Sequence, residues 1–550
     1  MKNNNKFRLD IWGFVTLGVI VLYAVFLVYP LGNMLVEAVY NKATQIFSLD
    51  QFIKFFSKPY YMNTLMNSFK VSIAATLTSI LVGTPLAYLF VQYKIKGKKI
   101  MQMLIIIASM SAPFIGAYSW ILLMGRNGVI TNLFASSLGL VLPDIYGFGG
   151  ILLVFTLQLY PLVFLYVQGA LSNVDNSLIE AAENMGCTGV KRFMKIIVPL
   201  IMPTLLAASL LVFMRALADF GTPMLIGEGY RTLPVLLFNE FISEVGGDAA
   251  FASAIAVITI IITTVVFLVQ KWLSNRKSFS MNSLHPIEEK EVHGIKNFLI
   301  HAFSYLVVGV AVMPQIYVIY TSFLKTKGMV FQPGYSLDSY KSIFNSSLGN
   351  SVWNTLFIPI TALIIIVLLA VLIAYIAVRR RNWLTNLVDT VSMIPYIVPG
   401  TVVGIALISS FKRPITGGML IMVIALIIRR LPYTIRSSVA VLQQIPMSIE
   451  EAALSLGSSK SKTFFKITMP MMSSGIISGA ILSWVTMISE LSTAIILYSV
   501  KTQTLTIAVY TSVIRGQYGV AAALSTVLTI LTVISLLVFN KISGGKNIQL

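Results

Sequence analysis

Two acidic residues lie within long apolar stretches of the sequence, where a charge is costly. Asp219 and Glu490 each fall near the end of an apolar run, and they are as far apart along the chain as Pro161 and Pro432. Ionisable side chains in membrane spans are expensive and often functional, so one interpretation is a gate or a pathway contact for a cationic or solvated solute. The alternative pairs Asp219 with Arg215 four residues earlier and lets Glu490 reach interfacial water. The sequence leaves both interpretations open.

The sequence contains few residues that could bind a metal through His or Cys or form a disulfide. Cys187 is the only cysteine, and the three histidines, His285, His293 and His301, fall in or beside one polar stretch. Metal sites need several converging ligands, so we predict no metal site and no disulfide. Arg429 and Arg430 lie in an apolar run near its inner half, and snorkelling toward the cytoplasm would explain them.

Nucleotide hydrolysis needs a phosphate-binding loop, which the sequence does not contain. The nearest match, GSSKSKT from Gly457, lacks the G-x-x-x-x-G-K-[ST] spacing. We therefore predict that the chain is not an enzyme by itself and binds no cofactor.

One polar motif occurs twice. Ser177–Pro203 reads SLIEAAENMGCTGVKRFMKIIVPLIMP, and Ser448–Ser474 reads SIEEAALSLGSSKSKTFFKITMPMMSS. Each copy predicts a short helix, a turn at Gly186 or Gly457 and a second helix. The S-x-x-E spacing at the start of each copy is the signature of a capping box.

The elements that carry these residues are membrane helices. Of the 550 residues, 57% are hydrophobic and 11% are charged, which a water-soluble protein of this size could not accommodate. At roughly 20 apolar residues per span, the sequence predicts twelve spans in two sets of six. They centre on 11–32, 67–91, 101–124, 149–170, 198–218, 252–273, 298–322, 355–378, 385–410, 417–437, 475–497 and 518–540. The first apolar run is too long for a cleaved signal peptide and is predicted to be a span.

The two sets are copies of one another. Asn67 and Tyr88 are matched by Asn354 and Tyr375 at one constant separation along the chain, and Pro161 is matched by Pro432 at a slightly shorter one. We therefore predict a first repeat at 1–274, a polar linker at 275–297 and a second repeat at 298–550. Because each copy has an even number of spans, both copies start on the same side of the membrane and the repeats are parallel, unlike the inverted repeats of many secondary transporters.

Small residues four apart predict close helix packing at Gly475 and Gly479, and at Thr204 and Ala208 in the first repeat.

Positive charge predicts the orientation. Fifteen Lys and Arg residues of the first half and linker collect on the side of the N-terminus, and six lie on the other side. By the positive-inside rule both termini and the linker are cytoplasmic. The formal charge of +20 is explained in this way, so we predict a lipid bilayer and no nucleic acid as the partner.

The duplicated motif resembles the EAA loop of binding-protein-dependent ABC importer permeases. The residues that match are Glu180, Ala181, Ala182 and Gly186, and Glu451, Ala452, Ala453 and Gly457. In that family the loop couples the permease to the ATPase. Arg429–Gly457 and Ser483–Tyr498 resemble fused permeases of the ferric-iron importer group, with related permeases for 2-aminoethylphosphonate, thiamine or polyamine much alike.

The resemblance implies an all-α permease of the type I ABC importer fold in the cell (inner or cytoplasmic) membrane. It implies that two copies of a separate cytoplasmic ATPase carry ATP and Mg²⁺, and that an extracellular or periplasmic binding protein delivers the solute. Ferric iron is the solute favoured by the resemblance. The rival class is an ion-coupled secondary transporter, which predicts a charge network at the midplane and uptake without ATP; a non-transporting membrane scaffold would not need two matched loops.

Overall fold

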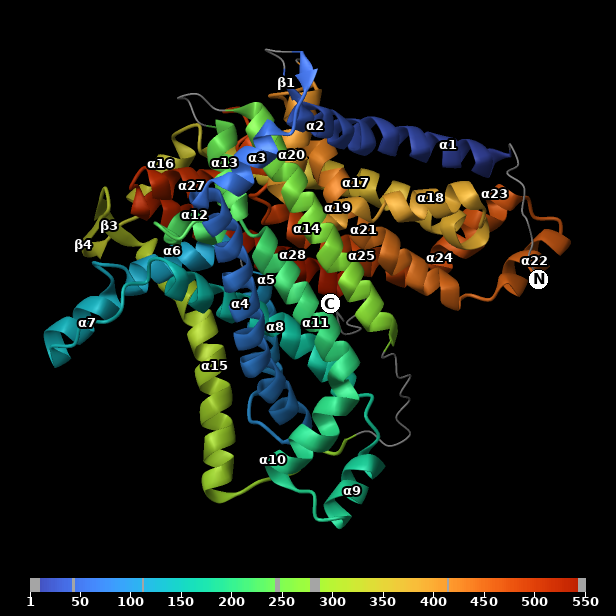
Figure 1. Ribbon diagram of the computed structural model, residues 1–550. Helices are drawn as coiled ribbons and strands as arrows, with labels where there is room; N and C mark the ends of the chain where they lie inside the picture. Colours follow the sequence, from blue (N-terminus) through green and yellow to red (C-terminus); the bar gives the residue numbers. More distant parts are fainter. Residues whose placement is uncertain are drawn as a thin grey trace. The chain divides into compact units, whose positions relative to one another are not determined.

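The protein is almost entirely helical in the computed structural model, which describes residues 10–41, 45–110, 113–242, 248–276, 287–412 and 415–542. The helices and four short strands follow the chain as shown in Figure 1. The strands form two small antiparallel hairpins, β1 (Tyr40–Asn41) with β2 (Ile46–Phe47) and β3 (Leu324–Lys327) with β4 (Val330–Tyr335). Apolar chains satisfy their backbone polar groups within helices when water is excluded, so this composition favours helices.

Eight segments of the described chain are long and apolar enough to cross a membrane. They are Ile11–Val39 (α1, Ile11–Tyr23, and α2, Tyr29–Val39), Pro59–Gln92 (α4), Phe148–Leu171 (α8), Gly189–Ala218 (α10, Gly189–Arg192, and α11, Val198–Ala218), Ala249–Val269 (within α14, Ala249–Arg276), Gly294–Thr321 (α15), Gly349–Arg379 (α17) and Tyr518–Phe539 (within α28, Tyr518–Ile542). The polytopic all-α prediction is confirmed.

Three further helical stretches are long and apolar enough only when the helices on both sides of a sharp bend are taken together, and the number is eleven if each of these counts as one span. They are α5 (Lys98–Met110) with α6 (Pro113–Met124) and α7 (Val129–Leu138), α18 (Trp383–Val391) and α19 (Ile394–Ile397) with α20 (Gly400–Ser410), and α23 (Lys460–Thr463) and α24 (Met469–Met471) with α25 (Ser473–Ile488). The chain turns by 110° between α19 and α20, where Pro399 and Gly400 interrupt the helix.

The remaining predicted span corresponds to α21 (Met419–Gln444). Arg429, Arg430 and Arg436 lower its hydropathy, so its helical length rather than its composition fits a span. The stretches predicted as spans at 385–410 and 475–497 are not continuous helices. Both stretches contain a break, and a short helix, α26 (Ala494–Leu497), follows the second. Hydropathy does not sense such breaks.

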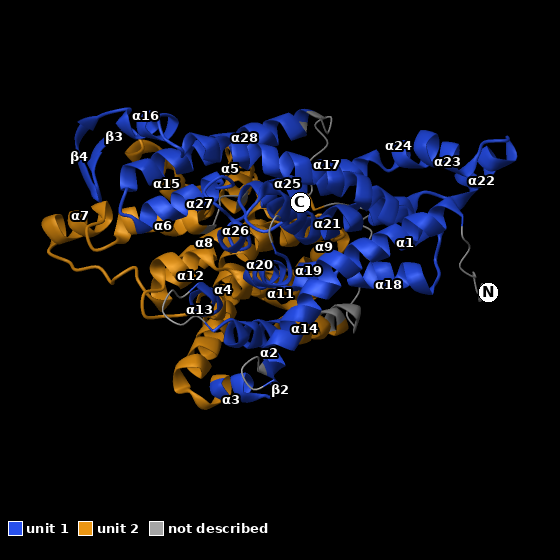
Figure 2. Ribbon diagram, turned by 90° about the horizontal axis from the view of Figure 1, so that it is seen from above, with its two compact units in different colours: residues 1–54, 237–260, 323–550 blue, residues 55–236, 261–322 orange. Residues whose placement is uncertain are grey.

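The described chain forms two compact units, coloured separately in Figure 2. Unit 2 comprises residues 55–236 and 261–322. In it α4, α8 and α11 pack together, and α15 packs against α5 and α6. Gly83 allows the close approach of α4 and α8, since a Cβ there would lie 2.7 Å from the carbonyl oxygen of Tyr160.

Unit 1 comprises residues 1–54, 237–260 and 323–550. Its centre is α17, α21 and α25, the counterparts of α4, α8 and α11 in the other repeat. Helix α2 packs on α20, and α27 (Leu505–Ile514) packs on α28.

The smaller helices of both units are α3 (Asp50–Ser57), α9 (Asn176–Asn184), α12 (Gly221–Ile226), α13 (Leu233–Ile242), α16 (Asp338–Phe344) and α22 (Met447–Ser455).

The units are not identical to the sequence repeats. The first helices of the first repeat, α1 and α2, belong to unit 1 with the helices of the second repeat. The first helix of the second repeat, α15, belongs to unit 2 with those of the first. Each repeat therefore contributes its first span to the other unit.

Part of the predicted linker lies in unit 2. The Lys290 amide donates to the carbonyl of Gln92 at 2.8 Å, and the Lys94 amide donates to the carbonyl of Lys290 at 3.2 Å. Lys94 and Glu291 form an exposed ion pair at 2.9 Å. Residues 287–293 are thus bound to the loop after α4. Residues 277–286 of the predicted linker, with His285, lie outside the described residues.

Candidate functional site

The first copy of the duplicated motif forms helix α9, followed by a turn and α10. Asp175 caps α9, because its side chain accepts a hydrogen bond from the amide of Ser177 at 3.0 Å. Glu180 accepts a bond from the side chain of Asn176 at 2.7 Å. The predicted capping box between Ser177 and Glu180 was therefore wrong. The helix begins earlier than predicted because Asp175 is itself a good N-cap.

The second copy forms α22, which begins after Pro446. No side chain caps this helix, so the capping box predicted between Ser448 and Glu451 was wrong here too. Pro446 has φ −60° and ψ 139°, the extended conformation of an N-cap residue. The backbone of Pro446 therefore starts the helix without a side-chain bond.

Both helices end in the same way, as the glycines predicted. Gly186 has φ +76° and Gly457 has φ +84°, in the left-handed region. The amide of Cys187 donates to the carbonyl of Ala182 at 2.8 Å, and the amide of Ser458 donates to the carbonyl of Ala453 at 3.0 Å. These bonds are those of a Schellman cap, in which a left-handed glycine ends the helix.

The two helices expose matching faces. Glu180 and Ala181 are exposed and Ala182 is buried, and Glu451, Ala452 and Ala453 repeat this pattern. The residue before each glycine is apolar and exposed: Met185 by 78% and Leu456 by 90%. A large apolar side chain this exposed at the same position of both copies marks a surface suited to a partner.

The first helix is anchored by charged residues behind this face. Glu183 forms ion pairs with the buried Arg192 and, at 3.0 Å, with Lys290 of the linker. Arg192 also donates to the hydroxyl of Tyr88 on α4 at 2.8 Å. Helix α9 is therefore tied both to α4 and to the linker.

The second helix is anchored from another direction. The Nε atom of Arg379 on α17 donates to Glu450 at 2.8 Å, and the hydroxyl of Tyr375 donates to the same carboxylate at 3.2 Å. The Arg379 and Glu450 side chains are 8% and 6% exposed. Arg379 also donates to the carbonyl of Ile445 at 2.8 Å. The pair thus fixes both α22 and the chain that enters it.

The two repeats hold their helices with different charged pairs, which lie at different positions of the repeat. The positions that hold Arg379 and Glu450 in the second repeat hold Gln92 and Ile179 in the first. The positions that hold Glu183 and Arg192 in the first repeat hold Leu454 and Thr463 in the second. The tyrosine is kept, as Tyr88 and Tyr375. These pairs were not predicted from the sequence. A position-by-position comparison of the repeats points to them, because the acid and the base of each pair are both present in one repeat and both absent from the other.

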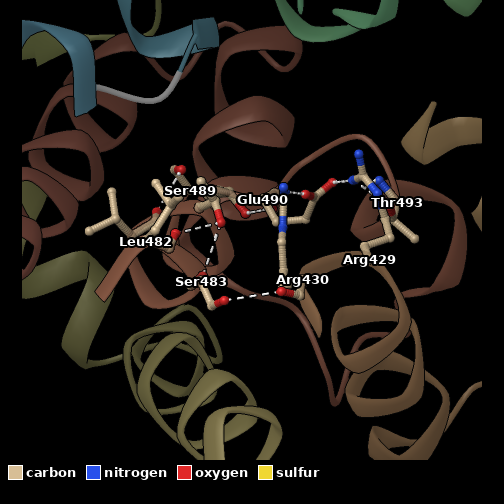
Figure 3. A network of polar contacts seen from close by, with 10 residues as sticks. Arg429, Arg430, Leu482, Ser483, Ser489, Glu490 and Thr493 are labelled. Carbon is tan, nitrogen blue, oxygen red and sulfur yellow. Dashed lines mark hydrogen bonds and ion pairs between the residues drawn. The ribbon is translucent and has the colours of Figure 1, made fainter. Parts of the chain in front are cut away.

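Glu490 is buried and belongs to a cluster of charged side chains. It forms ion pairs with Arg429, at 2.6 Å, and with Arg430 of α21 (Figure 3). Its Oε1 atom also accepts a bond from the amide of Thr493 at 3.0 Å. Of the two interpretations left open for Glu490, the one in which it reaches interfacial water does not hold, and the two arginines pair with Glu490 where snorkelling toward the cytoplasm was expected. The glutamate that binds them is distant in the sequence, which local spacing cannot reveal.

Asp219 is the first-repeat counterpart of Glu490 and has one contact in common with it. Its Oδ1 atom accepts a hydrogen bond from the amide of Thr222, three residues on, at 2.9 Å. Glu490 and Thr493 are also three residues apart. Each acid thus holds the turn that leads into a short helix, α12 or α26.

Small residues lie where α25 passes α21. A Cβ at Gly475 would lie 2.7 Å from the carbonyl oxygen of Ser437, and one at Gly479 would lie 2.6 Å from the Cα of Thr434. In unit 2, Ala208 on α11 is fully buried and Thr204 is partly buried. The close-packing role assigned to the four residues stays a prediction.

No cluster of three or more His, Cys, Asp and Glu residues with metal-site geometry occurs among the described residues. His301 accepts a hydrogen bond from the amide of Lys96 at 3.2 Å, in the loop after α4. Cys187 is a free, partly buried thiol.

Known proteins resemble the chain over most of its length. The family model for "Binding-protein-dependent transport system inner membrane component" matches twice, at residues 62–279 and 366–543, which confirms the duplication. "Ferric transport system permease protein FbpB" of Actinobacillus pleuropneumoniae is 28% identical over 97% of this chain and 78% of its own length. "Putative ferric transport system permease protein FbpB 1" of Haemophilus influenzae is 28% identical over 88% of this chain and 78% of its own. "Spermidine/putrescine transport system permease protein PotB" of Haemophilus influenzae is 26% identical over 50% of this chain and 97% of its own.

Proposed function

Because this chain belongs to the family of binding-protein-dependent transport system inner membrane components, we propose that it is the permease of an importer for ferric iron. The observation that carries the choice of solute is the length of the resemblance. The relatives named for ferric transport match along 97% and 88% of the chain, through both repeats. Relatives named for spermidine/putrescine and for 2-aminoethylphosphonate match 50% and 45% of it.

The energy for import comes, in this proposal, from two copies of a separate cytoplasmic ATPase that bind ATP and Mg²⁺. Each copy receives one coupling helix, α9 or α22. Glu180, Ala181, Ala182 and Gly186 make the first contact, and Glu451, Ala452, Ala453 and Gly457 make the second. The exposed Met185 and Leu456 support this assignment, because a groove on a partner would cover them.

The coupling helices move as rigid bodies. The Schellman caps and the ion pairs behind α9 and α22 fix each helix to its own bundle, so a movement of the helix is passed on to the spans. ATP binding draws the ATPase subunits together and opens the permease outward, where a binding protein delivers the solute. Hydrolysis then returns it to the inward-open state. Both termini lie in the cytoplasm, in agreement with the distribution of Lys and Arg.

Uptake measurements test this function. Cells without their own ferric uptake receive this permease with the ATPase and binding protein of its own source, and the accumulation of radioactive iron is measured. We expect accumulation that stops when the ATPase phosphate loop is mutated, and that falls sharply in Glu451→Lys at equal permease level. Accumulation of radiolabelled spermidine or 2-aminoethylphosphonate, without iron, would contradict the choice of solute. Iron uptake unaffected by the ATPase mutation would contradict the energy source.

A further inference from the structure

Two broken helices meet at the charge cluster of unit 1. Helix α20 begins at Gly400 after the 110° turn, and α25 ends at Ile488 before the irregular stretch that leads to α26. Both α20 and α26 pack on α21, which carries Arg429 and Arg430. These arginines lie ten and eleven residues from the start of α21, about 15 Å along it, which is near the middle of the span predicted at 417–437. Irregular backbone in the middle of a membrane span is tolerated where it lines a polar site or is buried in protein.

The cluster contains more positive than negative charge. The side chains of Arg429, Arg430 and Glu490 are 14%, 11% and 5% exposed, respectively. Among the described residues, Glu490 is the only acid in ion-pair distance of either arginine. One carboxylate therefore faces two guanidinium groups. A buried charge without a counter-charge is costly, so this excess calls for an anion.

The N-terminus of α20 adds to the positive potential. The helix has eleven residues, and Pro399 at its N-cap provides no side-chain acceptor for the first amides. The helix end touches the cluster: a Cβ on Gly400 would lie 2.5 Å from Nη1 of Arg429 and 2.7 Å from Oγ1 of Thr493. Glycine at this position therefore lets the helix end approach the guanidinium.

Donors in the cluster remain unused. The Nε atoms of Arg429 and Arg430 are buried and have no hydrogen-bond partner within the described chain. The Oγ1 atom of Thr401, the second residue of α20 and 1% exposed, also has none there. Buried donors are nearly always satisfied in proteins, so the two unused guanidinium donors, which meet at Glu490, favour a ligand with acceptor oxygens.

The first repeat shows that the fold does not require this charge. The positions of Arg429 and Arg430 are occupied by Gln158 and Leu159. The acid and the turn are kept, as Asp219 and Thr222. The two arginines are thus an addition to the second repeat alone.

We propose that Arg429, Arg430 and the N-terminus of α20 form a binding site for an oxyanion. The inference rests on the proposed function in one respect: the oxyanion is a carboxylate, phosphonate or phosphate group of the transported species. A bare cation or a polyamine would be repelled by this site. Ferric iron would pass this site together with an anion that ligates the metal. When no oxyanion is bound, the Glu490 carboxylate neutralises one of the two positive charges of the site.

Thermal unfolding of the purified full chain tests the site without any transport. The protein is placed in nanodiscs of zwitterionic phosphatidylcholine, and the unfolding midpoint is followed as inorganic phosphate is added. Sodium chloride at the same ionic strength is the reference. We expect a saturable rise of the midpoint with phosphate alone, since a ligand that binds only the native state stabilises it.

Variants assign the effect to the cluster. In Arg430→Gln the phosphate concentration that gives half the effect should rise by about tenfold or more. In Arg430→Lys it should rise by less, because lysine keeps the charge but loses the paired N–H donors of the guanidinium. In Glu490→Gln it should fall, because the competing carboxylate is neutralised. The matched control is Arg436→Gln, which removes an exposed arginine of the same helix, paired with Asp389 at 3.3 Å, and should leave the phosphate response unchanged.

The inference is overturned if phosphate acts no more strongly than chloride, or if Arg430→Gln and Arg430→Lys both respond as the wild type does. A phosphate effect that disappears in nanodiscs of anionic phosphatidylglycerol would assign the site to a lipid headgroup and overturn the assignment to a transported oxyanion. Failure of iron uptake in cells would leave the phosphate response intact, so the two proposals fail separately.

Discussion

At the scale of single residues, helices α9 and α22 differ in the charged side chains that hold them in place. In the second repeat the pair of Arg379 and Glu450 is buried on both sides. In the first repeat Glu183 is shared between Arg192 and the exposed Lys290. A buried charge that loses its partner is penalised far more than an exposed one. Loss of Arg192 would leave the partly exposed Glu183 paired with Lys290, whereas loss of Arg379 would leave the buried Glu450 without a counter-charge, so the second anchor is the more sensitive to loss of its arginine.

Removing one member of that buried pair should therefore destabilise unit 1. Glu450→Gln keeps the shape of the side chain and leaves Arg379 unpaired, and we expect a loss of about 3 kcal/mol or more in the free energy of unfolding. Hydrogen exchange should increase in α22 first. The control, Arg380→Gln, removes the neighbouring ion pair with Asp10, whose partners are both 31% exposed, and should cost less than about 1 kcal/mol. Equal effects of the two changes would show that the Arg379–Glu450 pair is not the anchor.

The sequence predicts the type of a residue's environment better than its partner. The acid at Glu490 was recognised as costly from its apolar surroundings alone. Its partners, Arg429 and Arg430, lie on another helix that precedes it by a long stretch of chain, and no local spacing connects them. The same holds for Arg379 and Glu450, which become partners only when α17 and α22 are brought together.

At the scale of elements, the C-terminal ends of α9 and α22 each depend on one backbone conformation. Gly186 and Gly457 have positive φ, and a Cβ at either position would meet open space. The requirement for glycine is therefore one of backbone energy and not of packing. This is why the turn was predictable from the sequence, whereas the start of the helix was not: several side chains near Asp175 could serve as the cap.

Substitutions at Gly457 should separate these two requirements. Gly457→Val should cost about 1–2 kcal/mol, because a β-branched residue resists the left-handed region. Gly457→Asn should cost less, since Asn tolerates that region. The measurement is iron uptake per folded permease, together with hydrogen exchange of the amides of Leu456 and Ser458. Asparagine and valine variants that behave alike would show that the new side chain itself, and not the turn, disturbs the surface.

At the scale of the whole molecule, the sequence repeats and the compact units divide the chain differently. The repeats were predictable because matched residues keep a constant separation along the chain. The exchange of first spans was not, because α1 and α15 are apolar helices that could pack on either bundle. The choice is made by particular contacts. Trp12 of α1 packs on Tyr375 and Phe464, with ring centres 4.3 and 4.8 Å apart, and Tyr305 of α15 donates to the carbonyl of Lys96 at 3.0 Å.

This exchange predicts that neither repeat folds alone but that the two complete one another. Fragments 1–276 and 287–550 are expressed separately and together, and resistance to protease in the membrane is measured. The second fragment alone lacks α1 and α2, so α17, α20 and the aromatic pair of Tyr375 and Phe464 lose their cover, and we expect rapid cleavage. Co-expression should restore resistance and allow the fragments to be purified together.

Trp12→Ala in the first fragment should weaken this recovery, since removing a buried tryptophan costs about 3–5 kcal/mol. The exposed Trp353 of α17, 66% accessible, is the matched control, and Trp353→Ala in the second fragment should change little. If 287–550 alone were as resistant as the full chain, each repeat would be complete without its partner's first span, and the exchange would have no role in folding.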